Sequence, residues 1–295
     1  MPSKQPQTTD QSSAITSAVV RQAQQLAERK QREIIEQMEL FLPQEGWSDT
    51  QRGVPNGILR SALFGAVPVR GKSEHLTREP MTSIKGVEIL YTGTRLSQLH
   101  LTLWGNIVHI AREHQLGNKC VTSTYQLLKL QGKKDTGGNR ETLYKQLAEL
   151  QATAVEVKQG RYSYTGSFID EAYRDSEIDR LIIVLNPRII ALFAPDQYTR
   201  LSWRVRMELT SPTALWLHGF YSSHEVPLAY NVSTIQKLCG SKNKSASAFL
   251  NNTLTDALQE LKLASLKHEI PFHYAIANKQ LHVSHEKEID PRKLG

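Results

Sequence analysis

Apolar residues recur at helical spacing over residues 17–41, a stretch without Gly or Pro that is rich in helix-forming residues. This pattern predicts an amphipathic helix. The preceding residues 1–16 are rich in Gln, Ser and Thr without periodicity and are expected to form a disordered tail. Residues 43–80 are interrupted repeatedly by Gly and Pro. We interpret them as a linker or an arm that wraps another surface.

The middle of the chain changes from helical periodicity to strand-like alternation. Ser123 or Thr122 can cap one predicted helix, which breaks at Gly132, and a polar turn with Gly137 and Gly138 precedes the next. Gly160 is expected at a hairpin tip. In chain order, the pattern predicts a strand at 87–91, helices at 96–114, 123–131 and 139–150 around a short strand at 120–121, and strands at 153–158, 162–172 and 178–185.

The last third of the chain shows the same succession. Ser211 followed by Pro212 is typical of an N-cap and first helical position. We expect a helix at 211–223, a strand at 228–232, a short helix to 240, a long helix after a Ser/Lys/Asn-rich turn, and strands at 265–275 and 280–285.

The two halves also match locally. Residues 147–150 (LAEL) align with 258–261 (LQEL) at an offset of 111, and Leu130 and Gly132 align with Leu238 and Gly240 at an offset of 108. The order helix, strand, helix, turn, helix, hairpin is that of a winged helix. We therefore predict an α+β protein with tandem winged-helix (winged helix-turn-helix) DNA-binding domains and a partly helical, flexible N-terminal arm. The expected limits are 1–80 for the tail, helix and arm, 81–195 and 196–287 for the two domains, and 288–295 for a tail.

Composition narrows the class of protein. The 295 residues include 36 Lys+Arg and 29 Asp+Glu, for a net charge of +7. No apolar run is long enough to span a bilayer, and the first residues do not resemble a secretory signal. Two cysteines exclude a disulfide scaffold and a cysteine zinc cluster. A cytoplasmic protein is expected, without membrane association.

The positive charge is distributed over the two predicted domains. Residues 1–80 carry 10 basic and 9 acidic groups, residues 81–195 carry 14 and 11, and residues 196–295 carry 12 and 9. No basic tail holds the excess, so a polyanion such as DNA would meet folded surfaces.

Candidate DNA contacts lie at the start of each third helix, where hydroxyl, amide and basic groups gather. A solvated polar face is the alternative explanation. In the second copy the candidates are Ser241, Lys242, Lys244, Ser245, Ser247, Asn251 and Asn252, with Lys279 near the closing turn. In the first copy they are Lys133, Lys134, Thr136, Asn139, Arg140 and Lys145. Arg140 could read a guanine or hold only a phosphate.

Three further groups of charged residues lie outside these helices. Arg161 and Tyr162, at the predicted hairpin tip, could contact the DNA backbone or form an ordinary turn. Arg200, Arg204 and Arg206 would share one face of a strand and form either a phosphate-binding stripe or part of a domain interface. An acidic patch, comprising Asp170, Glu171, Asp175, Glu177 and Asp179, is expected to face away from DNA.

Enzymatic signatures are incomplete. Five residues separate Gly65 from Gly71-Lys72-Ser73, where a P-loop requires four. The run from His109 to His114 lacks the order and spacing of a metalloprotease helix. We expect neither an enzyme nor a bound cofactor or metal.

Short runs along the chain resemble TrfA-type plasmid replication initiators. They span roughly 35–285 in matching order: 60–64 (RSALF), 91–93 (YTG), 150–154 (LQATA), 192–194 (LFA), 198–199 (YT), 209–214 (LTSPTA), 221–224 (YSSH) and 238–241 (LCGS). The resemblance implies two winged-helix domains that bind directly repeated sequences (iterons) at a plasmid origin. It also implies help in opening AT-rich DNA, including possible contact with its single strands, and recruitment of the host initiator and replicative helicase. Such proteins act as monomers on DNA, their dimers are less active, and they are not enzymes.

The same family carries a peptide that binds the bacterial sliding clamp ahead of its DNA-binding domains. Here Gln37, Met38, Glu39, Leu40 and Phe41 occupy that place. Leu40 and Phe41 would be the apolar anchors, while Met38 and Glu39 depart from the usual residues. The alternative is the apolar face of a helix.

Two other functions remain as alternatives. A transcriptional repressor or autoregulator of a plasmid gene could use the same fold, and only the clamp-like peptide argues against it. A relaxase or recombinase would need a histidine metal triad or an Arg/His/Tyr constellation, which we do not find in the sequence.

Overall fold

The computed structural model describes residues 47–67, 74–112, 119–160, 162–193, 196–290 and 292, together with Gln22 and Gln25. The chain divides into two compact units, Met1–Leu42 and Pro43–Gly295, and the elements below belong to the second. Gln22 and Gln25 are helical, as predicted, and the rest of the 17–41 stretch lies outside the described residues. No helix among the described residues is long and apolar enough to cross a membrane.

The segment expected to be a linker or arm is, over residues 47–67, part of the folded body. It forms β1 (Gln51–Pro55), α2 (Asn56–Leu59) and β2 (Phe64–Gly65). β1 pairs antiparallel with β11 (Tyr198–Ser202), and β2 pairs parallel with β5 (Leu96–Ser97). The arm interpretation is wrong for these residues, because the apolar side chains between the Gly and Pro breaks are buried in the core.

A first group of elements follows the predicted order of three helices and a small sheet. Strands β6, β10 and β9 form an antiparallel sheet in the order β6-β10-β9. The Nε2 atom of His100, in the first turn of α3, lies 2.8 Å from a carboxylate oxygen of Glu149 on α5. This contact joins the two helices. The elements are α3 (Gln98–Ala111), β6 (Lys119–Thr122), α4 (Thr124–Leu130), α5 (Gly137–Gln151), β9 (Ile169–Asp175) and β10 (Arg180–Leu185).

A separate sheet takes two of its strands from the chain between α5 and β9 and the other two from the chain before α3. Its strand order is β3-β4-β7-β8, formed by β3 (His75–Pro80), β4 (Val87–Thr94), β7 (Ala154–Gln159) and β8 (Tyr162–Gly166). The single strand predicted over 162–172 is therefore wrong. The chain crosses from β8 in one sheet to β9 in another at residues 167–168, where burial of Phe168 in the core fixes the crossing.

A second group repeats the order of the first. The sheet order is β12-β14-β13, which places the last strand between the other two as in β6-β10-β9. The Ser211 hydroxyl accepts a hydrogen bond from the backbone N–H of Ala214, and Pro212 is the first residue of α7, confirming that predicted helix start. The elements are α6 (Trp203–Glu208), α7 (Pro212–Ser222), β12 (Tyr230–Asn231), α8 (Val232–Leu238), α9 (Ala246–Phe249), the π-helix η2 (Leu250–Leu254), α10 (Thr255–Lys267), β13 (His273–Ala277) and β14 (Gln280–Ser284).

The third helix of this group follows the predicted Ser/Lys/Asn-rich turn and differs from the prediction at its other end. It begins at Ala246 after the N-cap Ser245, so residues 241–244 belong to that turn and not to the helix start at which the contact residues were predicted. It continues through η2 and α10 to Lys267, so the strand predicted over 265–275 is wrong in its first part. The apolar positions Leu258 and Leu261 continue to Ala264 at helical spacing, and their burial against the core keeps this stretch helical.

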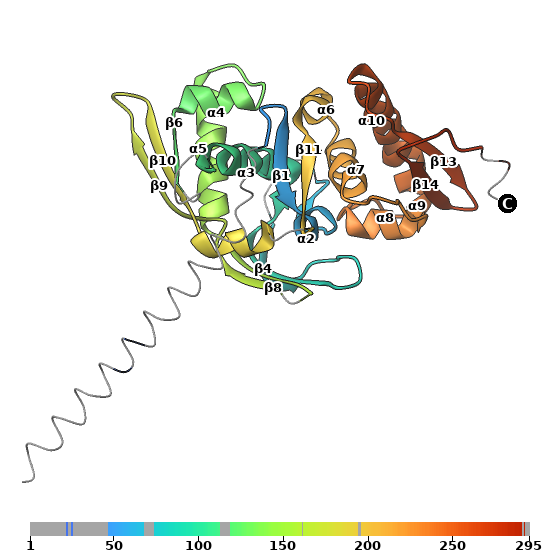
Figure 1. Ribbon diagram of the computed structural model, residues 1–295, viewed down its shortest axis with the longest axis horizontal. Coiled ribbons are helices and arrows are strands. Elements are labelled where there is room, and N and C mark those ends of the chain that lie inside the picture. The colour runs from blue at the N-terminus through green and yellow to red at the C-terminus, as the bar shows by residue number, and fades with distance from the viewer. Residues whose placement is uncertain are drawn as a thin grey trace, which may run out of the picture. The chain divides into compact units, whose positions relative to one another are not determined.

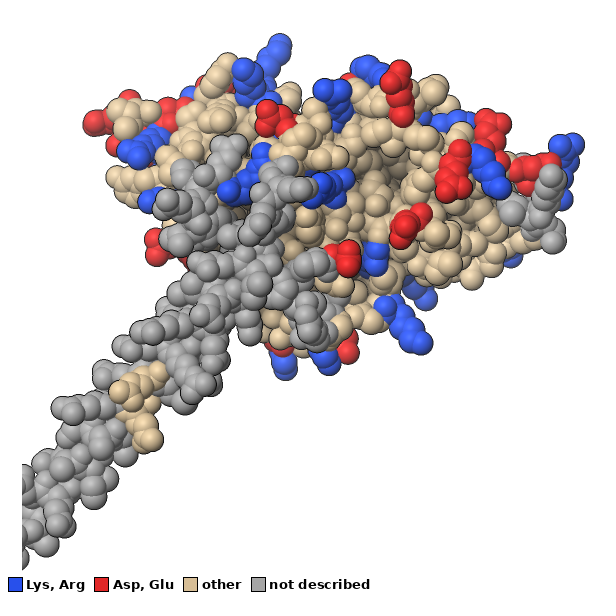
Figure 2. Space-filling model, viewed as in Figure 1, with Lys and Arg blue, Asp and Glu red and all other residues tan. Residues whose placement is uncertain are grey.

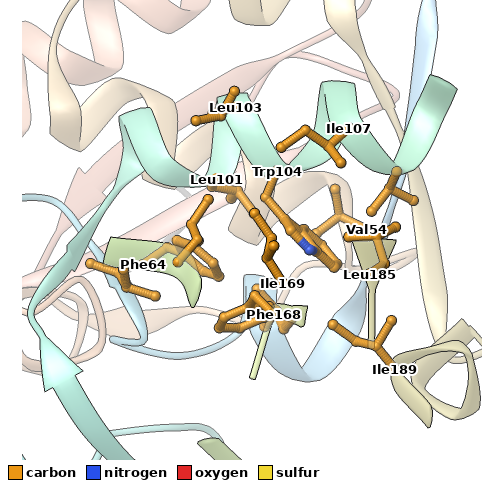
Figure 3. Packing of buried hydrophobic residues seen from close by; sticks show 14 of the residues in the cluster. Val54, Phe64, Leu101, Leu103, Trp104, Ile107, Phe168, Ile169, Leu185 and Ile189 are labelled. Carbon is orange, nitrogen blue, oxygen red and sulfur yellow. The ribbon is translucent and has the colours of Figure 1, made fainter. Parts of the chain in front are cut away.

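Buried residues form two hydrophobic clusters, one around each group of elements. In the first, the rings of Phe64, Trp104 and Phe168 pack together with centroids 5.2–6.5 Å apart (Figure 3). In the second, Trp216 stacks on Phe220 at 4.6 Å. Figure 1 shows the β9–β10 hairpin and the α10 region at opposite ends of the second unit.

The two groups are joined by direct contacts. A 3₁₀ helix, η1 (Pro187–Phe193), in which Ile189, Leu192 and Phe193 are buried, precedes β11, and β11 leads straight into α6. The Trp216 indole donates to the carbonyl of Ser61 at 3.0 Å, and the Ala66 N–H donates to the carbonyl of Cys239 at 2.7 Å. Residues 47–67 thus connect both clusters.

Candidate nucleic-acid interface

The start of α5 carries the first set of predicted contact residues. Thr136 is the N-cap, and its hydroxyl accepts from the backbone N–H of Asn139 at 3.3 Å. The Asn139 amide donates to the carbonyl of Lys134 at 2.7 Å, which holds the preceding loop against the helix start. Thr136 and Lys134 are exposed, and Lys133 is half-buried, which lowers the pKa of its ammonium group. This loop therefore presents two lysines and a hydroxyl beside the helix N-terminus.

Arg140, in the first turn of α5, is held by two carboxylates. Asp135 accepts from Arg140 Nε at 2.6 Å and from Nη2 at 2.7 Å, and Asp179 lies 3.3 Å from Nη1. The hydrogen bonds from Arg140 lower the pKa of Asp135 and, reciprocally, raise the pKa of Arg140. Among the described residues, these are the two acidic partners of Arg140.

One residue of the predicted acidic patch, Asp179, does not face away from the predicted DNA-contact helix. Asp179 lies at the end of the turn between β9 and β10, and its carboxylate also accepts from the backbone N–H of Tyr125 at 3.2 Å. Antiparallel pairing of β10 with both β6 and β9 carries this turn to the N-termini of α4 and α5. The expectation is therefore wrong for Asp179, since sheet topology and not sequence spacing sets its neighbours.

The hairpin expected at Gly160-Arg161 joins β7 to β8 in the separate sheet. The hairpin that corresponds in sheet order to β13–β14 is β9–β10 instead. Tyr162 begins β8, while Arg161 and the side chain of Tyr162 lie outside the described residues. Lys145, the last predicted contact on α5, is exposed and lies 4.0 Å from Glu149.

The three arginines between the two groups do not form a stripe on a strand. Arg200 is exposed on β11, which ends at Ser202, and Arg204 is exposed on α6. Arg206 is fully buried on α6. The phosphate-stripe interpretation is therefore wrong for Arg206, because the change from strand to helix turns its side chain into the interior.

Arg206 instead lies between the two groups of elements, which agrees with the alternative of an interface residue. Its guanidinium donates to the Gln98 carbonyl and side-chain oxygens at 3.0 Å each, to Thr102 Oγ1 at 3.1 Å and to the Leu215 carbonyl at 3.2 Å. These acceptors belong to α3 and α7. Burial lowers the pKa of Arg206 to about 9. The residue therefore links the two groups of helices.

The second set of predicted contacts divides between a loop and a helix. Within the loop, Ser241 is half-buried and donates to Asn243 Oδ1 at 2.5 Å, and Lys242 is paired with Glu74 at 2.8 Å. Lys244 is exposed. Ser245 accepts from the backbone N–H of Ala248 at 3.1 Å and so caps α9.

The exposed surface of the third helix carries Ser247, Asn251 and Asn252. Ser247 and Asn251 are four residues apart and lie close to one line along the helix surface. The β13–β14 hairpin turns through Asn278 and Lys279, whose φ values are 51° and 62°, as in a two-residue type I′ turn. Lys279 is exposed at this tip. The second group therefore presents a polar helix surface and a basic hairpin tip.

Lys and Arg side chains are interspersed with acidic ones on the face shown in Figure 2. The sequence interpretation missed the two carboxylates beside Arg140. Asp135 precedes Arg140 by five residues, which is not a helix-neighbour spacing, and Asp179 comes from a distant hairpin. The clamp-like residues 37–41 lie outside the described residues.

This chain is similar to a curated relative and to proteins of known structure. A curated relative, the plasmid replication initiator protein TrfA of Escherichia coli, is 28% identical over 260 residues, covering 83% of this chain and 67% of the relative. A crystal structure of domains 2 and 3 of RctB aligns with a TM-score of 0.47 and 16% identity, covering 70% of this chain and 84% of that one. The Pi initiator protein in complex with iteron DNA aligns with a TM-score of 0.42 and 12% identity, covering 68% of this chain and 98% of that one.

Likenesses at these TM-scores do not establish a common fold. The family comparison extends over more of the chain, since the model of the TrfA protein family matches residues 5–276. The chain therefore belongs to the TrfA protein family.

Proposed function

We propose that this protein initiates plasmid replication by binding directly repeated DNA sequences at an origin through two winged-helix domains, within residues 81–195 and 196–287. The observation that carries the proposal is the repeated element order. Each group contains a first helix, a short strand, two further helices and a hairpin, and the two small sheets share one strand order, β6-β10-β9 and β12-β14-β13. A winged helix has this connectivity.

In this proposal, equivalent elements of the two domains would meet DNA. α5 and the α9–η2–α10 helix occupy the third-helix position, which enters the major groove in this fold, and the hairpins β9–β10 and β13–β14 occupy the wing position. In the second domain, Ser247, Asn251 and Asn252 would reach base edges, while Lys244 and Lys279 hold phosphates.

The first domain would use Lys133, Lys134, Thr136 and Asn139 around the start of α5, with Arg140 at a base edge. Arg200 and Arg204 are exposed between the domains and suit phosphate contacts. Ser241, Lys242 and Ser245 would act by shaping the loop and helix start, because each is already engaged within the protein.

The family favours replication over the alternative, a winged-helix repressor or autoregulator of a plasmid gene. The relative from Escherichia coli is named as a plasmid replication initiator. By extension, we propose that the protein acts in the bacterial cytoplasm as a DNA-bound monomer, with a less active dimer. It would open AT-rich origin DNA, contact its single strands, and recruit the host initiator, the helicase and the sliding clamp, the last through residues 37–41. This role requires no catalytic step.

The test is equilibrium binding to duplexes that the protein selects from a randomised library. Each domain neutralises several phosphates in this proposal, so the log–log slope of affinity against salt should be about −6 to −10. The selected sequence should also occur as direct repeats beside an AT-rich stretch of the plasmid. Absence of a selected sequence, or a flat salt response, would refute the proposal.

A second experiment separates initiation from repression. Replacing Leu40 and Phe41 by Ala should abolish binding to the sliding clamp and leave DNA affinity unchanged, because these anchors precede both domains. Wild-type protein that binds its repeats but not the clamp would favour the repressor.

A further inference from the structure

Arg140 lies between two carboxylates that hold it in different ways. Asp135 engages the Nε and Nη2 groups together, at 2.6 and 2.7 Å, in a bidentate pair. Asp179 makes one contact, with Nη1, at 3.3 Å. Bidentate pairs at short distances are the stronger kind of charge-assisted hydrogen bond. The two carboxylates therefore differ in how firmly they hold the guanidinium.

The donors of Arg140 can be assigned one by one. A guanidinium has five N–H groups. Asp135 takes the Nε–H and one N–H of Nη2, and Asp179 takes one N–H of Nη1. Asp135 by itself leaves one N–H on Nη2 and two on Nη1, and Asp179 takes one of those on Nη1. Reading a guanine requires two donors side by side, for O6 and N7. The Asp135 contact leaves such a pair at the end of the guanidinium, whereas the Asp179 contact lies on one nitrogen of that pair and competes with the base there.

We propose that Asp135 is a positioning residue that orients Arg140 for base reading, and that Asp179 is a competing acceptor that only the correct base displaces. The inference rests on the proposed DNA-binding function. Asp135 keeps the guanidinium plane fixed when DNA arrives, so little side-chain freedom is lost on binding. Asp179 makes a wrong base unfavourable, because Arg140 would give up one partner without gaining another.

The surroundings of Asp179 suit this role. Its side chain is 30% exposed and that of Arg140 is 36% exposed, so DNA can reach both. A carboxylate at this place also repels phosphate, which disfavours docking of α5 on DNA that offers Arg140 no base. The backbone of Asp179 has a φ of 48°, a conformation that Asn also adopts readily, and its side chain accepts from Tyr125 N–H. Asp179→Asn therefore removes the charge while keeping the turn and the acceptor.

The test compares the full-length wild type with Asp135→Asn, Asp179→Asn and Glu177→Gln. The probes are the duplex selected by the wild type, its single-base-pair variants and a scrambled duplex. Glu177→Gln is the matched control, because Glu177 is an exposed carboxylate on the same turn and is not one of the two acids paired with Arg140 among the described residues.

Opposite effects are expected for the two Asp variants. Asp135→Asn should reduce discrimination at one base pair by about 5- to 100-fold, the range of a single bidentate base contact. Asp179→Asn should bind all probes more tightly and should narrow the ratio of selected to scrambled affinity. The Glu177→Gln variant should bind all probes more tightly by one common factor, so the ratios of affinity between probes should stay unchanged.

Each outcome decides the matter. Ratios of affinities do not depend on the folded fraction, so a loss of stability cannot imitate the expected result. An unchanged base profile for Asp135→Asn would overturn the positioning role, and equal behaviour of Asp179→Asn and Glu177→Gln would overturn the competing role. If the wild type itself selects no sequence, the proposed function fails first, and that result differs from either of these.

Discussion

His218 on α7 is buried, and we predict that it makes the stability of this protein sensitive to mild acid. Its Nδ1 has no hydrogen-bond partner among the described residues. Burial, together with the nearby charge of Arg206, lowers the pKa of His218 from 6.5 to about 3. The imidazole therefore stays neutral in the folded protein, while the unfolded chain binds a proton near its ordinary pKa.

The direction of the pH dependence of stability follows from the number of protons that each state binds. Between the folded pKa and the unfolded pKa, the unfolded state binds more protons, so stability rises with pH and is lost as the pH falls through this window. One proton corresponds to about 1.4 kcal/mol per pH unit. From neutral pH to about pH 5, the free energy of unfolding should decrease by about 2 kcal/mol on account of this residue alone.

The assay measures the free energy of unfolding in urea for the wild type and the His218→Gln variant. Unfolding is monitored by circular dichroism at pH values from about 8 to about 5. Glutamine has a similar volume and does not titrate, so the two stability curves should converge as the pH falls. Burial also lowers the pKa of His109 to about 4. Its contribution to the pH dependence of stability is the same in both proteins and cancels in their difference. Parallel curves across the whole range would refute the assignment of His218 as a buried neutral group.

Three further substitutions test how the loop before α9 and the junction between the two groups of elements are held. Gly240→Ala should destabilise the protein by about 1–3 kcal/mol in thermal unfolding, because residue 240 has a φ of 65° and its Cβ would lie 2.8 Å from Arg95 Nη2. Ser245→Ala removes the cap of α9 and should reduce the free energy of unfolding by about 1 kcal/mol in urea, with weaker binding to the selected duplex. Arg206→Lys cannot reach four acceptors with one ammonium group and should lower stability by about 1–3 kcal/mol, and an unchanged melting temperature would contradict its role at the junction.

Local patterns predicted α3, α4, α5, α7, α8 and α10 from their apolar stripes, but missed α2 and α6, which the patterns assign to a linker and a strand. The Thr136 cap of α5 and the Ser211-Pro212 start of α7 are where capping chemistry places them. The strands were harder to predict, since alternation identifies an extended segment but not its sheet. Nothing in residues 162–172 shows that β8 and β9 pair with different partners.

The candidate site divides in the same way. The polar starts of both third helices can be found from composition and spacing. Burial of Arg206 could not be predicted, because three arginines at even spacing look alike until the chain turns from β11 into α6.

By itself, the sequence determined the order of the main helices in the two groups, the repeat of that order and the polar residues at the two helix starts, because these depend on neighbours close in the chain. Only the tertiary structure decided that residues 47–67 join both clusters, that Arg206 is an interface residue, and that Asp179 meets Arg140. Such contacts depend on how strands pair across the sheet, and a side chain's partners 39 residues away leave no periodic signal for the sequence to show.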